Sequence, residues 1–96
     1  MRIDAIMIKA KDNVATALRD LHSEEEATVS SGESQNQIKM IEAIPFGHKF
    51  AVLPINEGEH IIKYGEIIGS ATQFIEQGAH AHIQNIESLR GRGDLD

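Results

Sequence analysis

The stretch Ile44-Pro45-Phe46-Gly47 has the same pattern as two later stretches, Ile55-Asn56-Glu57-Gly58 and Ile75-Glu76-Gln77-Gly78. Each is an isoleucine, two intervening residues and a glycine, and each directly precedes a candidate strand. We interpret the pattern as a tight turn, in which the isoleucine is buried and the glycine adopts a backbone conformation that other residues avoid. Spacings of 11 and 20 residues are too irregular for a solenoid. The pattern therefore predicts a compact β fold of short strands.

The segments around these turns carry strand signals, namely alternating or continuous apolar residues bounded by glycine or proline. The segment over 23–35 is polar and is expected to be a loop, with a short strand at Thr28-Val29. We expect the other strands at 2–10, 37–41, 48–53, 60–64 and 80–86.

Two short helical segments are expected beside the strands. Asp12-Asn13 offers an N-cap, and Val14, Leu18 and Leu21 follow at i, i+4 and i+7, on one face of a short helix. The residues over 70–73 have the spacing of a capping box, which predicts one helical turn. The expected fold class is therefore mainly β with one or two short helices.

Length and composition limit the class of protein. The chain has 96 residues, enough for one small domain, and no cysteine, so its stability must come from apolar packing, which association with other chains can supplement. The net charge of −6 argues against nucleic-acid binding and against an anionic membrane surface. The sequence shows no signal peptide and no membrane-spanning run, so a soluble cytoplasmic protein is expected.

The segment His80-Ala81-His82 is the strongest local signal for chemistry. Side chains alternate faces along a strand, so His80, His82 and Gln84 are expected to share one face. Two imidazoles at i and i+2 can bind one metal ion, and a further ligand must then come from elsewhere. The alternative is a surface strand with two solvated histidines, and spacing alone favours it.

Three other residues are weaker candidates for chemistry. His48, followed by Lys49 at the start of an apolar strand, could be a general base or bind an anion, or could be a polar residue at a strand entrance. Lys63 could hold a carboxylate or extend its ammonium group into water. Spacing favours the second alternative in both cases. His22 and His60 are expected at the surface.

Four fragments, in order, resemble chains of the altronate/galactarate dehydratase family. Together they are much more specific than any one alone, and the resemblance covers residues 1 to about 90. One position departs from the family pattern, because Gln84 stands where the family usually has a third histidine, and glutamine is a poorer metal ligand. The fragments are Asp12-Asn13-Val14-Ala15-Thr16-Ala17-Leu18, Ile44-Pro45-Phe46-Gly47-His48-Lys49-Phe50-Ala51, Ile62-Lys63-Tyr64-Gly65-Glu66-Ile67-Ile68-Gly69 and Gly78-Ala79-His80-Ala81-His82-Ile83-Gln84-Asn85.

The resemblance implies a SAF-type β-clip domain over residues 1–88, followed by a polar tail over 89–96 that contacts a large subunit. In some relatives this module is the N-terminal domain of a larger enzyme, and in others it is a separate small subunit. Because the chain ends at Asp96, we expect a small subunit. Self-association of the isolated chain is a further expectation.

The activity that the resemblance implies is β-elimination of water from a sugar acid, which gives a 2-keto-3-deoxy acid. Family membership implies a divalent metal, with iron as the first choice and manganese as the alternative. The dehydratase large subunit is expected to carry most catalytic residues, so this chain alone should be inactive. The implied site consists of the metal ligands His80 and His82, the catalytic candidates His48, Lys49 and Lys63, and the substrate contacts Gln84 and Asn85.

Two alternatives remain open. The same module serves sulfolactate sulfo-lyases, which eliminate sulfite from a sulfonated hydroxy acid, so the chain could be the small subunit of such an enzyme. It could also be a non-catalytic binding or assembly module whose histidines merely lie at the surface.

Overall fold

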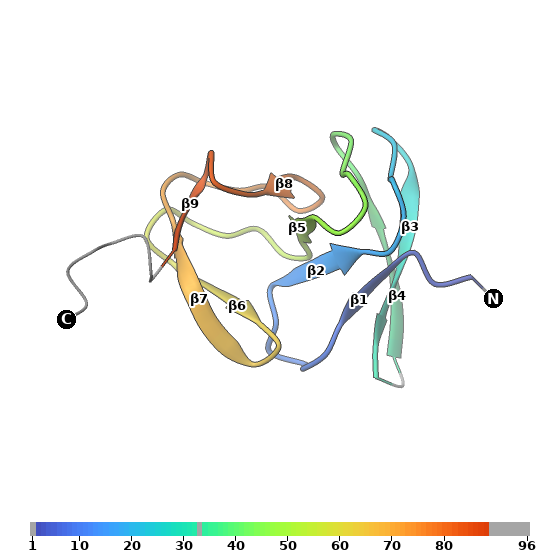
Figure 1. Cartoon of the computed structure of the whole chain (residues 1–96), viewed down its shortest axis with the longest axis horizontal. Helices are drawn as coiled ribbons and strands as arrows, with labels where there is room; N and C mark the ends of the chain where they lie inside the picture. The colour runs from blue at the N-terminus through green and yellow to red at the C-terminus, as the bar shows by residue number, and fades with distance from the viewer. Residues whose placement is uncertain (1, 33, 89–96) are drawn as a thin grey trace.

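The computed structural model describes residues 2–32 and 34–88, and within these ranges the chain forms short strands and no helix (Figure 1). The prediction of a mainly β fold is thus confirmed. The predicted tail over 89–96 lies outside the described residues. The strands are β1 (Ala5–Met7), β2 (Val14–Ala17), β3 (Glu26–Ser31), β4 (Ser34–Lys39), β5 (Lys49–Ala51), β6 (His60–Lys63), β7 (Glu66–Ala71), β8 (His80–Ala81) and β9 (Ile86–Ser88).

The strands form two sheets. The larger has six strands in the order β4-β3-β1-β2-β5-β8, and the smaller has the order β6-β7-β9. All neighbours pair antiparallel except β1 and β3, which run parallel. Figure 1 shows the small sheet beside the β2-β5-β8 end of the large one. Since the described ranges contain no helix, they also contain none that is long and apolar enough to cross a membrane.

Two apolar clusters lie on opposite faces of the large sheet. Successive residues of a strand point to opposite faces, so β2 supplies Ala15 to one cluster and Val14 to the other. In the same way β5 supplies Phe50 to the first cluster and Ala51 to the second. The second cluster also contains Ile61 and other residues of the small sheet, and therefore joins the two sheets.

The three predicted turns are confirmed. Ile44, Ile55 and Ile75 are fully buried, and the glycine of each turn has a positive φ, for example 87° at Gly78. A hydrogen bond closes each turn, as where the N–H of Ala79 donates to the carbonyl of Glu76 at 3.0 Å. The isoleucine side chain therefore fixes the turn to the core, while glycine permits the reversal.

A fourth turn of the same kind was not predicted. Leu21 is buried like the three isoleucines, and Glu24 has a φ of 74° where the other turns have glycine. Isolated bridges pair Leu21 with Ile44, and Ile55 with Ile75, so the four turns associate two by two. The sequence concealed this turn because neither the isoleucine nor the glycine is present in it.

The predicted helix after Asp12 is wrong. Val14–Ala17 forms β2, which is hydrogen-bonded between β1 and β5 in the middle of the large sheet. The Asp12 carboxylate accepts hydrogen bonds from the N–H groups of Ile8 and Lys9, so it closes a turn instead of capping a helix. Pairing on both edges of the strand overrides the helical spacing of three apolar residues.

Two further predictions of local structure are also wrong. The helical turn expected over 70–73 is not formed, because Ser70 and Ala71 end β7 and pair with Glu87 and Ile86 of β9. The polar segment over 23–35 is mostly strand, since β3 and β4 form a hairpin through Gly32. Only one side of this hairpin packs on the core, which explains its polar sequence.

Candidate functional site

Three histidines from two separate parts of the chain meet at the end of β5 and β8. Lys49 pairs with Ala81, and Phe50 pairs with His80. This register places His48, directly before β5, beside His82, directly after β8. One ligand nitrogen from each of His48, His80 and His82 lies within 4.8 Å of the others.

The three half-buried imidazole rings contact one another. His48 Nδ1 and His80 Nε2 are 2.9 Å apart and share a hydrogen bond. The ring centroids lie 5.1 Å apart for His48 and His80, 4.7 Å for His48 and His82, and 5.3 Å for His80 and His82. We call these three residues the histidine cluster. They form the one group of three or more potential metal-ligating side chains identified among the described residues.

The environment favours neutral imidazoles. Burial lowers the pKa of His80, the positive charges of His48, His82 and Lys49 lower it further, and Glu42 opposes the shift. Burial also lowers the pKa of His82, with added repulsion from His48 and Lys49. A neutral imidazole keeps a nitrogen lone pair that can bind a metal ion or accept a proton.

Asn85 and Glu42 hold the backbone of the cluster. Asn85 Oδ1 accepts a hydrogen bond from the N–H of His82 at 2.9 Å, and Asn85 Nδ2 donates to the carbonyl of His80 at 2.9 Å. Glu42 accepts a hydrogen bond from the N–H of His80 at 2.9 Å. Both polar atoms of Asn85 are therefore engaged in positioning histidines, while its predicted contact with substrate stays a prediction. Glu42 was not predicted, because no motif marks it.

The predicted strand over 80–86 is wrong in its second half. β8 ends at Ala81 and a turn follows, in which the N–H of Asn85 donates to the carbonyl of His82 at 3.0 Å. Gln84 therefore does not continue the face of the two histidines. Its exposed amide donates to the carbonyl of His80 at 3.4 Å. The imidazole that joins His80 and His82 is instead that of His48, which lies 32 residues before His80 in the sequence.

Of the two predicted lysines, the structure places Lys49 beside the cluster and Lys63 near Lys49. Lys49 lines a small cavity together with His82, and burial and repulsion from Lys63 lower the pKa of Lys49. The ammonium group of Lys63 lies 4.9 Å from the centre of the Tyr64 ring. The structure thus brings Lys49 next to the cluster, and Lys63 close enough to Lys49 to repel it.

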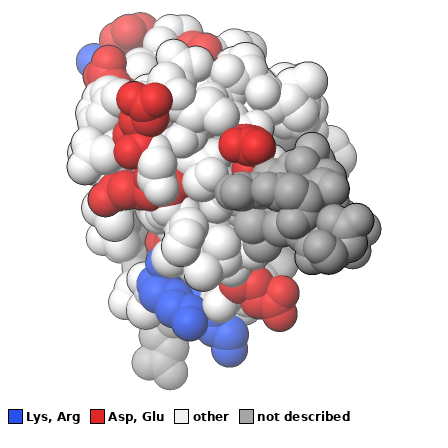
Figure 2. Space-filling model, turned by 90° about the vertical axis from the view of Figure 1, so that its left-hand side faces the viewer, with Lys and Arg blue, Asp and Glu red and all other residues white. Residues whose placement is uncertain are grey.

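Several lysine side chains of this acidic chain lie close together near the turn that joins β6 and β7. Figure 2 shows most of the basic side chains in view gathered at the lower end of one face, with an acidic group beside them and further acidic side chains above. Around the turn that joins β6 and β7, the side chains of Lys9 and Lys11 converge on Gly65, where an added Cβ would lie 3.0 Å and 3.7 Å from their carbon atoms. Lys63 is in the same hairpin.

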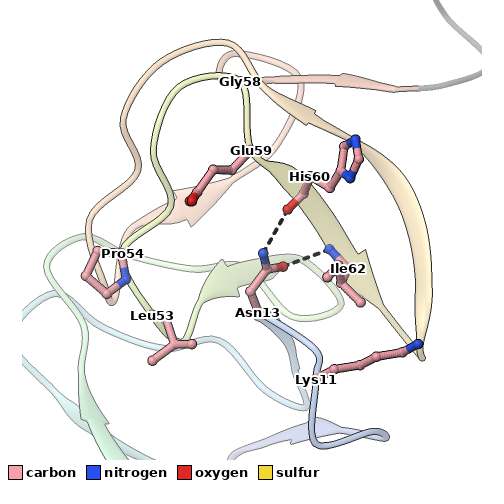
Figure 3. A pocket seen from close by; sticks show the side chains of 8 residues that line it. All are labelled: Lys11, Asn13, Leu53, Pro54, Gly58, Glu59, His60 and Ile62. Atoms are coloured by element: carbon pink, nitrogen blue, oxygen red, sulfur yellow. Dashed lines mark hydrogen bonds between the residues drawn. The ribbon is translucent and has the colours of Figure 1, made fainter.

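A wider cavity of about 590 Å³ lies elsewhere, over β6 (Figure 3). Lys11, Asn13 and His60 are among its lining residues. The Asn13 amide is occupied, because it donates to the carbonyl of His60 at 2.9 Å and accepts from the N–H of Ile62 at 2.8 Å. His60 is exposed, as predicted. This cavity contains no member of the histidine cluster, so size alone does not mark the candidate site.

The histidine cluster suits a divalent transition metal. Such ions bind imidazole nitrogen at about 2.0–2.1 Å, so their ligand nitrogens must lie within a few ångström of one another. The three nitrogens here meet that condition, and the lowered pKa values of His80 and His82 favour the form that binds metal. Three protein ligands would also leave coordination positions for further oxygen ligands.

Comparison with known proteins supplies the family. Residues 3–89 match the altronate/galactarate dehydratase SAF domain. The chain is 38% identical over 91 residues to an altronate dehydratase of Escherichia coli (strain K12), an alignment that covers 95% of this chain and 17% of that enzyme.

Two sulfo-lyase subunits are also similar. The chain is 43% identical over 54 residues to (2R)-sulfolactate sulfo-lyase subunit alpha of Chromohalobacter salexigens, covering 56% of this chain and 57% of that subunit. It is 36% identical over 62 residues to the subunit alpha of Paracoccus pantotrophus, covering 65% of this chain and 92% of that subunit.

These matches are to proteins named as dehydratases and lyases. The chain spans less than a fifth of the altronate dehydratase and little more than half of the first sulfo-lyase subunit. The match to the family nevertheless extends over nearly the whole chain, and the all-strand structure agrees with the predicted SAF-type β-clip. The chain therefore belongs to the SAF domain family of altronate and galactarate dehydratases.

Proposed function

We propose that this chain is the SAF module of a sugar-acid dehydratase, and that His48, His80 and His82 hold a divalent metal at the site of β-elimination. The observation that carries the proposal is the convergence of three imidazoles, which bring their ligand nitrogens within 4.8 Å of one another. Iron is the proposed metal and manganese is the alternative, since both accept imidazole and oxygen ligands.

The names of the relatives suggest the substrate class. Altronate, galactarate and sulfolactate are all carboxylates with a hydroxyl group on the neighbouring carbon. In the proposed reaction a base removes the proton on the carbon beside the carboxylate, and the hydroxyl group on the next carbon leaves as water. The resulting enol rearranges to a 2-keto-3-deoxy acid.

The residues of this chain would prepare the site for that reaction. A bound divalent metal would act as a Lewis acid that stabilises negative charge developing on the substrate carboxylate. Neutral His80 and His82 would bind it, while Asn85 and Glu42 fix the backbone that carries these two side chains. Lys49, beside His82, would add positive charge.

A large catalytic chain or domain would supply the remaining residues. The altronate dehydratase relative is several times longer than this chain, and the sulfo-lyase relatives are named as subunits. Large apolar side chains next to the histidine cluster in sequence are exposed, at 66% for Phe46 and 84% for Ile83. We expect the large chain to cover these two side chains. On this proposal the isolated chain is inactive.

The metal proposal is tested by titrating the purified chain with Mn²⁺ or, without oxygen, Fe²⁺, and measuring bound metal. His48→Ala, His80→Ala and His82→Ala should each lower the affinity by more than about 100-fold, beyond the 10–100-fold typical of changes around the ligands. His60→Ala, which removes an exposed histidine of the other cavity, is the matched control and should bind normally. Normal binding by all three cluster variants would refute the metal site.

The catalytic proposal is tested in the complex with the large dehydratase chain. The double variant His80→Ala/His82→Ala should abolish release of 2-keto-3-deoxy acid while still co-eluting with that chain. If its activity and metal content matched the wild type, the module would instead serve binding or assembly without a part in catalysis.

A sulfo-lyase is the second candidate, favoured by one observation. The match to the Paracoccus protein spans 92% of that subunit, so in that enzyme the module makes up nearly the whole subunit. The same complex, supplied with sulfolactate, should then release sulfite. Sulfite release without dehydration of sugar acids would support this candidate over the dehydratase.

A further inference from the structure

We propose that the small cavity beside Lys49 binds the carboxylate of the hydroxy-acid substrate, so that Lys49 is a substrate-binding residue; this inference rests on the proposed function. The cavity has a volume of about 110 Å³. Its lining residues are Lys49, Ile68, His82, Ile83, Ile86 and Ser88.

The position of the cavity connects Lys49 to the histidine cluster. Lys49 belongs to β5, where it is paired with Ala81 on one side and with Thr16 of β2 on the other. Paired residues share a face, and Ala81 belongs to the second apolar cluster, which joins the two sheets. Lys49 therefore points to the side of the large sheet that packs against the small sheet. His82 belongs both to the cavity and to the cluster. An anion at Lys49 would therefore lie directly beside the proposed metal ligands.

The charge of Lys49 has no counter-ion in the part of the chain that the structure describes. Arg2, Arg19 and Lys39 form ion pairs there, whereas Lys49, like the half-buried Lys63, forms none among the described residues. Lys49 is half-buried, and a partly desolvated ammonium group is costly unless it is paired. A carboxylate in the cavity would supply the missing charge.

A second polar group without a partner lies next to Lys49. The hydroxyl oxygen of Thr16 is buried and has no hydrogen-bond partner in the described structure. Thr16 is the direct cross-strand neighbour of Lys49, so the two side chains start about 4.5–5.5 Å apart. Buried polar groups are nearly always paired, so an exception calls for an explanation, such as a catalytic role or a bound water molecule or ion.

The cavity is large enough for an acid group but not for a whole sugar acid. A water molecule takes about 30 Å³ of liquid, so the cavity has room for a carboxylate with one or two carbon atoms. Two partly buried isoleucines, Ile68 and Ile86, line it and lower the local dielectric constant, which strengthens the attraction between Lys49 and an anion. The carboxylate would lie between Lys49 and the cluster, and the rest of the substrate would extend out of the cavity past His82.

The test is binding of glycerate, which has a carboxylate and the two neighbouring hydroxyl groups, to the full metal-free chain treated with EDTA. Glycerate should shift the amide NMR signals of His82 and Ile83. Lys49→Met, which keeps the apolar stem, should weaken binding by about tenfold or more. Lys49→Gln serves as the second variant if the first unfolds. Lys11→Met, in the other cavity, is the matched control and should bind like the wild type.

Two further arms identify the ligand group. 2,3-Dihydroxypropane-1-sulfonate carries a sulfonate beside the same two neighbouring hydroxyl groups, and glycerol carries no charge. Glycerate binding in excess of both supports a carboxylate site, whereas preference for the sulfonate, or binding of glycerol with equal affinity, would overturn it. Unchanged glycerate binding in both Lys49 variants would also overturn it. The metal proposal is judged separately. It fails if the wild-type chain binds neither Fe²⁺ nor Mn²⁺, or if all three cluster variants bind metal normally.

Discussion

Single residues with positive φ occur at several of the turns where this chain reverses direction. Of the three turns with the Ile-x-x-Gly pattern, the one at Gly78 is the most constrained. Gly78 packs against the backbone of Lys39, and an added Cβ there would lie 2.1 Å from the Lys39 carbonyl oxygen. At Gly58 the φ is nearly the same, 89° against 87°, but an added Cβ would meet nothing within 4 Å. These two positions therefore separate backbone strain from steric overlap.

Gly78→Ala and Gly58→Ala make the first prediction. Gly58→Ala should lower the free energy of unfolding by about 1–2 kcal/mol, the cost of a left-handed conformation for a residue with a Cβ. Gly78→Ala must also displace backbone, so we expect a loss of more than about 4 kcal/mol, which places it among exceptional substitutions. Urea unfolding of both variants checks this, and equal losses would contradict the proposed overlap with Lys39.

At the scale of elements, the turn between β1 and β2 connects the two sheets. Asp12 accepts hydrogen bonds from the N–H groups of Ile8 and Lys9, at 3.1 Å each, and from that of Gly65 in the β6–β7 hairpin at 2.7 Å. Burial opposes ionisation of Asp12, but these backbone hydrogen bonds outweigh it and lower the pKa of the carboxyl group. One buried carboxylate thus stabilises both the turn and the contact with the hairpin.

Asp12→Ala tests this role. The substitution leaves three backbone N–H groups without their acceptor, and we expect the free energy of unfolding to fall by about 2–4 kcal/mol. Glu57→Ala changes an exposed carboxylate in another turn and should stay within about 0.5 kcal/mol of the wild type. Thermal and urea unfolding provide the measurement. Equal stability of the two variants would show that Asp12 does not hold the hairpin.

At the scale of the whole molecule, ion pairs and hydrogen bonds between one arginine and two acidic side chains join the segments around the parallel strands β1 and β3. Arg19 forms ion pairs with Asp4 at 3.0 Å and with Glu25, and Asp4 accepts a hydrogen bond from the N–H of Thr28 at 2.8 Å. The hydrogen bond from Arg19 lowers the pKa of Glu25 from 4.5 to about 2, with help from the N–H of His22. The network therefore depends on ionised carboxylates.

The predicted consequence is a loss of stability in acid. The pKa of Glu25 is lower in the folded than in the unfolded chain, so its contribution is present above pH 4.5 and is lost as the pH falls towards about 2. Glu25→Gln should lower the free energy of unfolding at pH 7 by about 1 kcal/mol, because solvent screens the pair. Near pH 2 the variant and the wild type should be equally stable.

Glu24→Gln is the control for this prediction, because Glu24 pairs with Lys39 at the surface, where both side chains are mostly exposed. It should follow the wild type at every pH. Urea unfolding between pH 2 and pH 7 provides the curves. A constant difference between Glu25→Gln and the wild type over that range would contradict the role of the ionised carboxylate.

The sequence by itself determined the features that depend on neighbouring residues. The isoleucine and glycine of each repeated turn act within four residues, so the turns at Gly47, Gly58 and Gly78 and the β class could be predicted. The fourth turn was missed because Leu21 and Glu24 take the same conformation without the signal, at the cost of a positive φ for glutamate.

The tertiary structure alone decided what depends on strand pairing across the chain. Pairing with β1 and β5 made a strand of Val14–Ala17, whose apolar spacing had predicted a helix. Pairing of β5 with β8 brought His48 to His80 and His82, so the third imidazole came from a distant segment and not from position 84. The physical reason is that hydrogen bonds between strands join residues far apart in sequence, and local patterns do not record which strands will meet.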